Sequence, residues 1–500
     1  MLKILTSHQT KELDAYTIQH RGIASIDLME SACHAVLTWF TERFDPSKKV
    51  GVVCGTGNNG GDGLGVARLL KDVGYTVQVW IVKKNVPESP DFKTNLDRLK
   101  DKIEPVYILD QVGPELFSGC DILFDGIFGS GLSRSPEGTY AEVIKAMNQS
   151  EAVRIAIDIP SGLMADKPSN GSILKAHHTL SFQLPKLAFL LPQNHSFVGN
   201  WTLLEIGLHK DFIRQLDTEH CFLTQKDVRK ILRVRSKFDH KGLYGHALLI
   251  AGSYGKMGAA VLAANAALRS GIGLLTLHTP KCGYVVLQTS VPEAMVSIDD
   301  GEEYLSMYPT LDDYTTIGIG PGLGQAKETS KAFQEILQKC QVPMVIDADA
   351  LNMLASNREL LQLVPPGSIL TPHPKEFERI VGKWQNDFER LEKQKRLAKD
   401  LNSVIVLKGA YTSIAAPDGN VFFNSSGNPG MAKGGCGDVL TGILTGLLAQ
   451  KYPALQSAQI GVFLHGFSGD LAVFEKGMNG LTASNLIDFL PEAFKQAENG

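Results

Sequence analysis

The feature that most constrains the fold is a repeated alternation of short apolar runs with stretches of helical spacing. In the first half, Asp62–Val73 and Tyr140–Asn148 have helical spacing and lie between runs that are rich in β-branched residues. We predict these runs to be buried strands: Lys49–Cys54, Thr76–Val82, Asp121–Phe124, Arg154–Ile157 and Thr179–Phe182. Alternation of this kind predicts an α/β fold, in which helices cover parallel sheets.

The same alternation restarts after residue 240, so we expect two domains in this chain of 500 residues. The expected strands of the second half are His246–Ile250, Leu274–Leu277, Thr316–Ile319, Met344–Ile346, Ser368–Leu370 and Val404–Leu407. The charged segment Leu208–Arg235 has two helix-like turns and no glycine-rich loop. We therefore place the boundary near residue 215, which gives domains 1–214 and 215–500. Two amphipathic helices, Ser7–Thr17 and Ile26–Phe44, are expected before the first strand.

Composition excludes several classes of partner. The chain has 49 lysines and arginines against 53 acidic residues, a net charge of −4, so no basic field is available for nucleic acid. We find no secretory signal at the start and no apolar run of the ~18 residues that a membrane span needs. The seven cysteines are scattered without a Cys-x-x-Cys pair, which argues against a disulfide framework or a cysteine zinc site. We expect a cytoplasmic protein.

A glycine-rich turn follows the first predicted strand. Gly55, Gly57 and Gly60 satisfy G-x-G-x-x-G, but the strand Thr76–Val82 is not followed by the acidic residue that supports a dinucleotide fingerprint. A general phosphate cradle at a helix N-terminus is the safer interpretation. The alternative is that these glycines serve only tight packing.

Polar residues end two further strands of the first half. Asp125 follows one strand, and Asp158 and Ser161 follow another. Ligands of open parallel sheets bind where the carboxyl ends of strands meet, so these residues are expected to converge with the glycine-rich turn. The two carboxylates could be cation ligands, acid–base groups or caps of the following helices.

Three motifs of the first half together resemble the NAD(P)H-hydrate epimerase family: Asn58-Asn-Gly-Gly-Asp-Gly, Asp125-Gly-Ile-Phe-Gly-Ser-Gly-Leu and Asp158-Ile-Pro-Ser-Gly. The resemblance covers about residues 1–214. It implies a Rossmann-like three-layer α/β/α domain that interconverts the (R) and (S) forms of hydrated NADH and NADPH (NADHX and NADPHX). It also implies a K⁺ ion held by Asn59, Asp125 and Ser161, whose oxygens are hard ligands. The implied substrate contacts are Asn58, Asn59, Gly60, Gly61, Asp62, Gly129, Ser130, Gly131, Leu132, Ser133, Arg134, Ser135 and Asp158.

The implied reaction requires proton transfer. In the hydrate, C6 of the nicotinamide ring carries a hydroxyl beside the ring nitrogen. Inverting C6 means losing and regaining the hydroxyl, or opening and reclosing the ring, and a positioned carboxylate can move the proton in either route. Asp158 is our sequence-based candidate for this catalytic group.

The strongest signal of the second half is Asn428-Pro-Gly-Met-Ala-Lys-Gly-Gly-Cys-Gly-Asp. Gly434, Gly435 and Gly437 leave backbone N–H groups free to face an anion where a helix with apolar periodicity begins. We expect these amides to stabilise a transferring phosphoryl group while Asp438 takes the proton from the attacking hydroxyl. The alternative is that Asp438 only steadies the helix.

This motif resembles the Gly-x-Gly-Asp signature of ribokinase-like folds. Together with Gly252-Ser-Tyr-Gly-Lys, Gly318-Ile-Gly-Pro-Gly, Val345-Ile-Asp-Ala-Asp and Thr371-Pro-His-Pro, it resembles the ADP/ATP-dependent NAD(P)H-hydrate dehydratase family over about residues 222–500. The resemblance implies a ribokinase-like α/β domain that uses Mg²⁺ and ADP, or ATP, to dehydrate the (S) hydrate, giving AMP and phosphate with ADP. The implied substrate contacts are Ala259, Gly322, His373 and Asp438, and the implied nucleotide contacts are Lys408, Gly409, Ala410, Tyr411, Thr412 and Gly437.

Two positions depart from the family pattern: Cys436 stands where Thr or Ser is usual, and Lys375 where Gly is common. The first keeps the backbone donor, so the anion site is expected to survive. The second affects only local loop shape.

Other functions remain open at this point. A ribokinase-like kinase of a small alcohol or vitamin, fused to an accessory ligand-binding domain, would use the same Asp438. The first half could also be a non-catalytic binding module, although its polar residues are all present. Gly252–Met257 lacks Walker A spacing and is no P-loop. By analogy with ribokinase-like repair enzymes, we expect a homo-oligomer.

Overall fold

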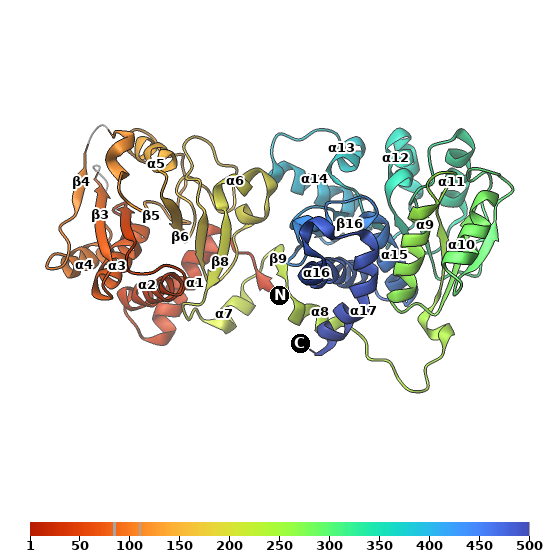
Figure 1. The fold of residues 1–500 in the computed structure, drawn as a ribbon, viewed down its shortest axis with the longest axis horizontal. Coiled ribbons are helices and arrows are strands. Elements are labelled where there is room, and N and C mark those ends of the chain that lie inside the picture. The colour runs from red at the N-terminus through yellow and green to blue at the C-terminus, as the bar shows by residue number, and fades with distance from the viewer. Residues whose placement is uncertain (84–86, 110–111, 500) are drawn as a thin grey trace. The chain divides into compact units, whose positions relative to one another are not determined.

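The computed structural model describes residues 1–83, 87–109 and 112–499 (Figure 1). The chain divides into two compact units, one of residues 2–218 and one of residues 219–500 that also includes Met1. The boundary predicted near residue 215 lies at the end of α7 (Lys210–Gln215), and the structural division falls after Thr218. The reason is that β9 (His220–Leu223) hydrogen-bonds to the sheet of the second unit.

The first unit is built on a parallel sheet with the order β4-β3-β2-β5-β6-β7-β8. Its strands are β2 (Lys49–Cys54), β3 (Thr76–Val82), β4 (Val106–Ile108), β5 (Ile122–Gly126), β6 (Val153–Ile157), β7 (His178–Phe182) and β8 (Asn200–Leu204). Its helices are α1 (Ser7–Arg21), α2 (Ser25–Thr41), α3 (Asn58–Asp72), α4 (Pro90–Leu99), α5 (Thr139–Gln149), α6 (His195–Val198) and α7, and β1 (Leu2–Lys3) precedes them.

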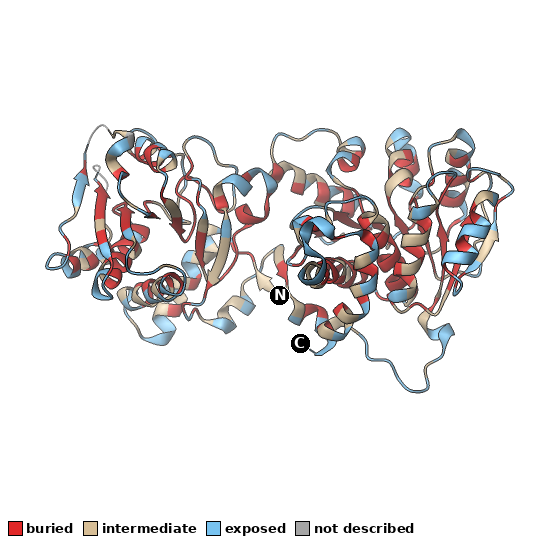
Figure 2. Ribbon diagram, viewed as in Figure 1, coloured by how far each residue is buried: buried red, intermediate tan, exposed pale blue. Residues whose placement is uncertain are grey.

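Both faces of this sheet are buried, as the alternation of side chains along β2 shows. Val52 and Cys54 pack into the core under α2 and α3, whereas Val53 packs into the core under α5. Figure 2 shows the buried residues concentrated along these strands. The predicted three-layer α/β/α architecture of a Rossmann-like domain is therefore confirmed.

The second unit contains a larger sheet with the order β9-β18-β17-β16-β15-β14-β13-β10-β11-β12. Its strands are β9, β10 (His246–Ile250), β11 (Leu274–Thr279), β12 (Met295–Ile298), β13 (Thr316–Ile319), β14 (Met344–Ile346), β15 (Ile369–Leu370), β16 (Val404–Leu407), β17 (Ser413–Ala415) and β18 (Val421–Asn424). Its helices are α8 (Gln225–Ile231), α9 (Met257–Arg269), α10 (Tyr284–Ser290), α11 (Lys327–Lys339), α12 (Ala348–Ser356), α13 (Pro374–Val381), α14 (Asp387–Asp400), α15 (Cys436–Ala449), α16 (Ala454–Gly480) and α17 (Ala483–Asn499).

Helix α15 can reach its position because of its glycines. A Cβ at Gly442 would lie 2.0 Å from the carbonyl oxygen of Ala263, and one at Gly446 would lie 1.9 Å from Ser270 Oγ. These two glycines therefore let α15 pack directly against α9. This packing places the first turn of α15 beside the carboxyl ends of the parallel strands.

The sequence predicted most strands but missed several features. Strand β17 runs antiparallel to both β16 and β18, which departs from the expected purely parallel pattern. The short strands β4, β8, β9, β12, β17 and β18 were not predicted, and the first four of them are only partly buried. The helix predicted to begin at Asp62 begins at Asn58, because Gly57 serves as its N-cap. Strand β5 continues to Gly126, so Asp125 lies inside the strand and does not follow it.

None of the helices in the described residues combines the length and apolar character that crossing a bilayer requires.

Candidate active sites

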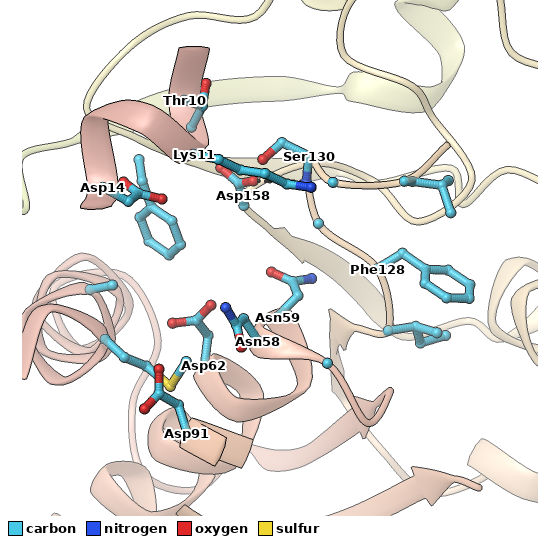
Figure 3. Close-up of a pocket in the computed structure, with 18 of the residues that line it drawn as sticks. Thr10, Lys11, Asp14, Asn58, Asn59, Asp62, Asp91, Phe128, Ser130 and Asp158 are labelled. Atoms are coloured by element: carbon cyan, nitrogen blue, oxygen red, sulfur yellow. Dashed lines mark hydrogen bonds between the residues drawn. The ribbon is translucent and has the colours of Figure 1, made fainter. Parts of the chain in front are cut away.

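The first unit contains a cavity of about 870 Å³ at the carboxyl ends of its parallel strands. Helix α1, the first turn of α3, and the loops after β5 and β6 form its walls (Figure 3). Most residues predicted to contact substrate line this cavity: Asn58, Asn59, Asp62, Gly129, Ser130, Gly131, Leu132, Ser133, Arg134, Ser135 and Asp158. The convergence of three separate motifs is what the parallel topology predicts.

Two of the predicted substrate contacts, Gly60 and Gly61, do not reach the surface of the cavity. A Cβ at Gly60 would lie 1.9 Å from the carbonyl oxygen of Gly55, and one at Gly61 would lie 2.9 Å from Met29 Sδ. Neither glycine lines the cavity. Gly60 lets α3 begin close to the turn that follows β2, and Gly61 lets α3 pack against Met29 of α2.

Asp158 is held as an anion at the back of the cavity. Its Oδ1 accepts a hydrogen bond of 2.6 Å from Lys186 Nζ, and its Oδ2 accepts one of 3.1 Å from the backbone N–H of Ser130. Burial raises the pKa of Asp158, but Lys186 and Ser130 outweigh burial and hold it below its ordinary value. The residue has φ of +67°, an uncommon conformation for a residue other than glycine. Two fixed partners therefore position this carboxylate.

Asp125 and Ser161 form a buried pair next to Asn59. Ser161 Oγ donates to Asp125 Oδ1 at 2.6 Å, and Ser161 N donates to Asp125 Oδ2 at 2.7 Å. Burial raises the pKa of Asp125 to about 6, against the lowering effect of the hydrogen bonds from Ser161. The side-chain Nδ2 of Asn59 is buried and has no hydrogen-bond partner among the described residues.

Among the other carboxyl groups that line the cavity are Asp14 on α1 and Asp62 on α3. Burial, helped by the charge of nearby Asp158 and opposed by Lys186, raises the pKa of Asp14 to about 7. Burial also raises the pKa of Asp62 well above its ordinary value, helped by Asp158, Asp14 and Asp91. Carboxyl groups that share a small space cannot all be ionised at neutral pH.

The second site forms around the start of α15. Gly435, with φ of +91°, is the N-cap, and Gly437 and Asp438 belong to the first helical turn. Burial, helped by the charge of Asp347 and opposed by Lys408, raises the pKa of Asp438 to about 6. A carboxylate with a pKa near neutrality, beside free helix N–H groups, can accept a proton while the amides face an anion.

Asp347 connects three elements of this site. Its Oδ1 accepts from Lys408 Nζ at 2.8 Å, and its Oδ2 accepts from Thr441 Oγ1 at 2.7 Å. A Cβ at Gly437 would lie 3.6 Å from Lys408 Nζ, so this lysine lies directly against the first turn of α15. The predicted nucleotide contacts Lys408 and Gly437 are therefore adjacent. The rest of that segment turns back on itself, because Thr412 Oγ1 donates to the carbonyl of Gly409 at 2.9 Å; Ala410 and Tyr411 lie within this turn.

The predicted substrate contacts of this unit lie at neighbouring strand ends. Gly322 has φ of +65°, and its Cβ would lie 3.1 Å from that of Ala259. His373 is the N-cap of α13, where its Nδ1 accepts from the backbone N–H of Lys375 at 3.1 Å. Burial lowers the pKa of His373, and Lys408 lowers it further, so the ring is neutral at pH 7. This cap satisfies one ring nitrogen and leaves Nε2 near Glu376.

A second layer of contacts holds the loops of this site. Asp349 Oδ2 accepts from the backbone N–H of Gly324 at 2.8 Å and lies 3.4 Å from Lys256 Nζ. His465 on α16 is half-buried, and its Nε2 lies 2.9 Å from the carbonyl oxygen of Cys436. Burial lowers the pKa of His465 to about 4, so the neutral ring donates to this carbonyl. Within the described part of the chain, no group of three or more His, Cys, Asp or Glu residues is arranged to hold a metal ion.

Comparison with known proteins relates both units to one family. The YjeF-related protein N-terminus family matches residues 25–188, and the NAD(P)H-hydrate dehydratase family matches residues 247–492. The bifunctional NAD(P)H-hydrate repair enzyme Nnr of Moorella thermoacetica is 35% identical over 99% of this chain and 97% of its own length. The chain belongs to the family of bifunctional NAD(P)H-hydrate repair enzymes.

Other members of the repair enzyme family show the same full-length match. The enzyme of Coxiella burnetii is 34% identical over 98% of this chain and 99% of its own length, and that of Escherichia coli K12 is 32% identical over 94% and 89%. Among solved structures, a ribokinase-like superfamily protein of Enterococcus faecalis is similar with a TM-score of 0.51 and 27% identity, covering 57% of this chain and 99% of that protein. The ribokinase-like fold predicted for the second unit is thus confirmed. The ADP/ATP-dependent NAD(P)H-hydrate dehydratase of Bacillus subtilis, co-crystallized with ATP/Mg²⁺, has a TM-score of 0.49 and 36% identity, covering 56% and 99%.

Several residues of the two sites were not singled out from the sequence. Lys186 lies in the loop after β7, and a lysine shortly after a strand end could have signalled a partner for Asp158. Asp14 lies next to buried Leu13 on α1. An acidic residue beside the apolar face of a helix is the one signal in the sequence that could have identified Asp14 as a site residue. His465 lies inside the long helix α16, and no local pattern distinguishes it from a histidine of the core.

Proposed function

We propose that this chain repairs hydrated NADH and NADPH in the cytoplasm. The first unit interconverts the (R) and (S) hydrates, and the second dehydrates the (S) form at the expense of ADP. The membership of the chain in the repair enzyme family over its full length supports both activities.

The cavity of the first unit is suited to a hydrated nicotinamide dinucleotide. Its volume of about 870 Å³ falls in the range of ligand-sized cavities. Backbone N–H groups at the start of α3 and in the loop after β5 can receive the diphosphate, since helix N-termini favour anions. Asp158 then fixes the polar end of the nicotinamide ring.

Asn59, Asp125 and Ser161 fit a monovalent cation such as K⁺. The amide oxygen of Asn59, the carboxylate of Asp125 and the hydroxyl of Ser161 are hard oxygen donors, and Asp125 is a buried carboxylate without an ion-pair partner among the described residues. A K⁺ ion there would supply the positive charge that a buried carboxylate lacks. Exchanging K⁺ for Na⁺ in the assay should lower the rate of epimerisation and leave dehydration unchanged.

The observation that carries the second activity is the placement of Asp438. Its carboxylate lies in the first turn of α15, beside the helix amides, and burial and Asp347 raise its pKa toward neutrality. Asp438 takes the proton from the C6 hydroxyl as that oxygen attacks the terminal phosphorus of ADP, and AMP leaves with the electron pair of the broken P–O bond. The phosphorylated oxygen then leaves C6 as phosphate, driven by the ring nitrogen, and loss of a proton from C5 restores NADH.

Lys408 and the amides of Gly437 and Asp438 contribute charge stabilisation. Lys408 is held at 2.8 Å from Asp347, so its ammonium is fixed beside the position of the phosphates. Mg²⁺ would be bound mainly by the phosphates and water, with one or two of Asp347, Asp349 and Asp438, as this ion prefers.

A product assay tests this proposal against the kinase alternative. Purified protein with the (S) hydrate and ADP should give NADH absorbance, AMP and phosphate in equal amounts, whereas a kinase would give a stable phosphomonoester. The variant D438N should lose about 10²–10⁴-fold in dehydration rate, the range of a lost general base, and keep epimerisation. D400N, at an exposed position of α14, is the matched control and should keep both activities. A stable phosphorylated product, or full dehydration by D438N, would refute the proposal.

A further inference from the structure

We infer that Asp14 of α1 is the residue that exchanges a proton with the C6 hydroxyl during epimerisation. The inference rests on the proposed epimerase function of the first unit. Asp14 lines the same cavity as Asp62 and Asp158, and Figure 3 shows these three carboxyl groups around one open space, each carried by a different element. Asn59 lines this cavity too, and its buried Nδ2, without a partner among the described residues, is a donor left for a ligand.

Asp158, the catalytic candidate predicted from the sequence, is poorly placed to exchange a proton. Both of its oxygens accept hydrogen bonds, at 2.6 Å from Lys186 Nζ and at 3.1 Å from Ser130 N. Lys186 is itself fixed by a second contact, at 2.6 Å to Ser181 Oγ. Asp158 therefore remains an anion and serves to position the substrate and to balance a positive charge on the ring.

Asp14 has the opposite surroundings. Within the described residues, its carboxyl group makes no hydrogen bond or ion pair, so both oxygens are available to a ligand. The charged groups that line the cavity with Asp14 are Lys11 on its own helix, Asp62 on α3, Asp91 on α4, Arg134 and Glu137 after β5, and Asp158 after β6, which pairs with Lys186. Burial, helped by Asp158 and opposed by Lys186, raises the pKa of Asp14 to about 7. Asp14 can thus both hold and release a proton at neutral pH.

The proton of Asp14 converts the C6 hydroxyl into a leaving group. The protonated carboxyl gives its proton to the hydroxyl oxygen, and the C6–O bond breaks with its electron pair leaving as water. The lone pair of the ring nitrogen forms a C6=N double bond, which places a positive charge on the ring near Asp158. Water then adds to the opposite face of C6 and passes its proton through a second water molecule to the Asp14 carboxylate, and the electron pair of the double bond returns to nitrogen. The reaction has no net oxidation, and the enzyme regains its starting protonation state.

The test is the pH profile of epimerisation by the full-length chain. Chromatography of the two epimers measures the reaction, and nucleotide is left out so that no dehydration takes place. For the wild type, kcat/KM should fall tenfold per pH unit above about 7, because the free enzyme must carry the proton. In D14N, kcat/KM should be about 10²–10⁴-fold lower, and this inflection should be absent. D14E, which keeps a carboxyl group, should recover part of the rate together with an inflection.

Two controls separate a catalytic role from a structural one. E12Q changes an exposed acid two residues away on α1, and should keep the wild-type rate and profile. The thermal unfolding of D14N should show the same transition of the first unit as the wild type, which shows that this unit has folded, and dehydration of the (S) hydrate should be unchanged. Epimerisation by D14N at the wild-type rate, or with the same inflection, would overturn the role of Asp14. If the wild type does not epimerise at all, the proposed function of the first unit fails instead.

Discussion

At the scale of single residues, the ion pair between Lys186 and Asp158 is the most consequential contact in the first unit. The lysine side chain is 6% exposed and that of the aspartate 12%, and their atoms are 2.6 Å apart. A buried pair adds little net stability, but removing one partner leaves an uncompensated charge inside the protein. The two residues are therefore expected to depend on each other for both folding and positioning.

We predict that K186M lowers the free energy of unfolding of the first unit by ~3–5 kcal/mol at pH 7. The double variant D158N/K186M should recover part of this loss, because no buried charge remains. Since Lys186 and Ser130 hold the folded pKa of Asp158 below 3.8, the stabilisation that the wild type draws from this carboxylate is present at neutral pH. It should disappear as the pH falls through that lowered pKa. Urea unfolding of the three proteins at several pH values measures this, and equal losses in the single and double variants would contradict it.

The sequence predicted the residues of the first site that belong to strand-end motifs, and missed those that reach the site through tertiary packing. Asp125, Asp158 and Ser161 follow or end apolar runs, so parallel topology alone brings them together. Asp14 and Lys186 reach Asp158 from a helix before the first long strand and from a loop after β7. Their positions depend on how α1 and that loop pack, and the periodicity of a single sequence does not encode this.

At the scale of elements, two glycines at the start of α15 are needed for different reasons. Gly437 is needed for ligand binding, and Gly435 is needed for folding. A Cβ at Gly437 would meet Lys408 Nζ at 3.6 Å and Asp347 Oδ2 at 3.8 Å, which are ordinary contacts. A Cβ at Gly435 would meet Leu262 Cδ1 at 2.8 Å and Ala483 Cβ at 2.9 Å, and φ there is +91°. The same substitution is therefore expected to have different effects at two positions only two residues apart.

We predict that G437A keeps the wild-type midpoint of thermal unfolding and raises KM for ADP by at least tenfold, because the methyl group occupies the space beside Lys408 that a phosphate would use. G435A should instead lower the free energy of unfolding by ~1–3 kcal/mol, the cost of a strained left-handed residue. Calorimetry together with ADP saturation curves separates the two effects. A G437A protein with unchanged KM for ADP would show that the phosphates bind elsewhere.

In the second unit, the strands that extend the sheet beyond β16 were the least predictable from the sequence. Strand β9 comes from the segment 208–235, which the charge pattern identifies only as a linker, and it adds to the sheet beside β18. Strands β17 and β18 form an antiparallel hairpin that continues a parallel sheet. These strands have only three or four residues each, so they leave weak apolar periodicity in the sequence even where they are buried.

At the scale of the whole molecule, each site is completed by residues of its own unit. The described residues that line the first cavity all lie between Thr10 and Leu208, and the second site is built from residues between Ser253 and His465. Each unit also has hydrophobic cores of its own. The two reactions should therefore be separable by substitution within one intact chain.

We predict that two variants, each of which lacks one of the two activities, complement each other in solution. D14N/D158N should dehydrate the (S) hydrate but not the (R) hydrate, and D438N should epimerise but produce no NADH. An equimolar mixture given the (R) hydrate and ADP should form NADH after a lag, because the (S) hydrate must leave one chain and bind another. Stopped-flow absorbance of NADH measures both the lag and the final rate.

If the (S) hydrate accumulates while NADH stays absent, then the second site does not accept substrate from solution, and the two sites depend on each other within one chain. Full activity of the mixture would instead establish that each unit works by itself and that the fusion serves to supply both activities in equal amounts.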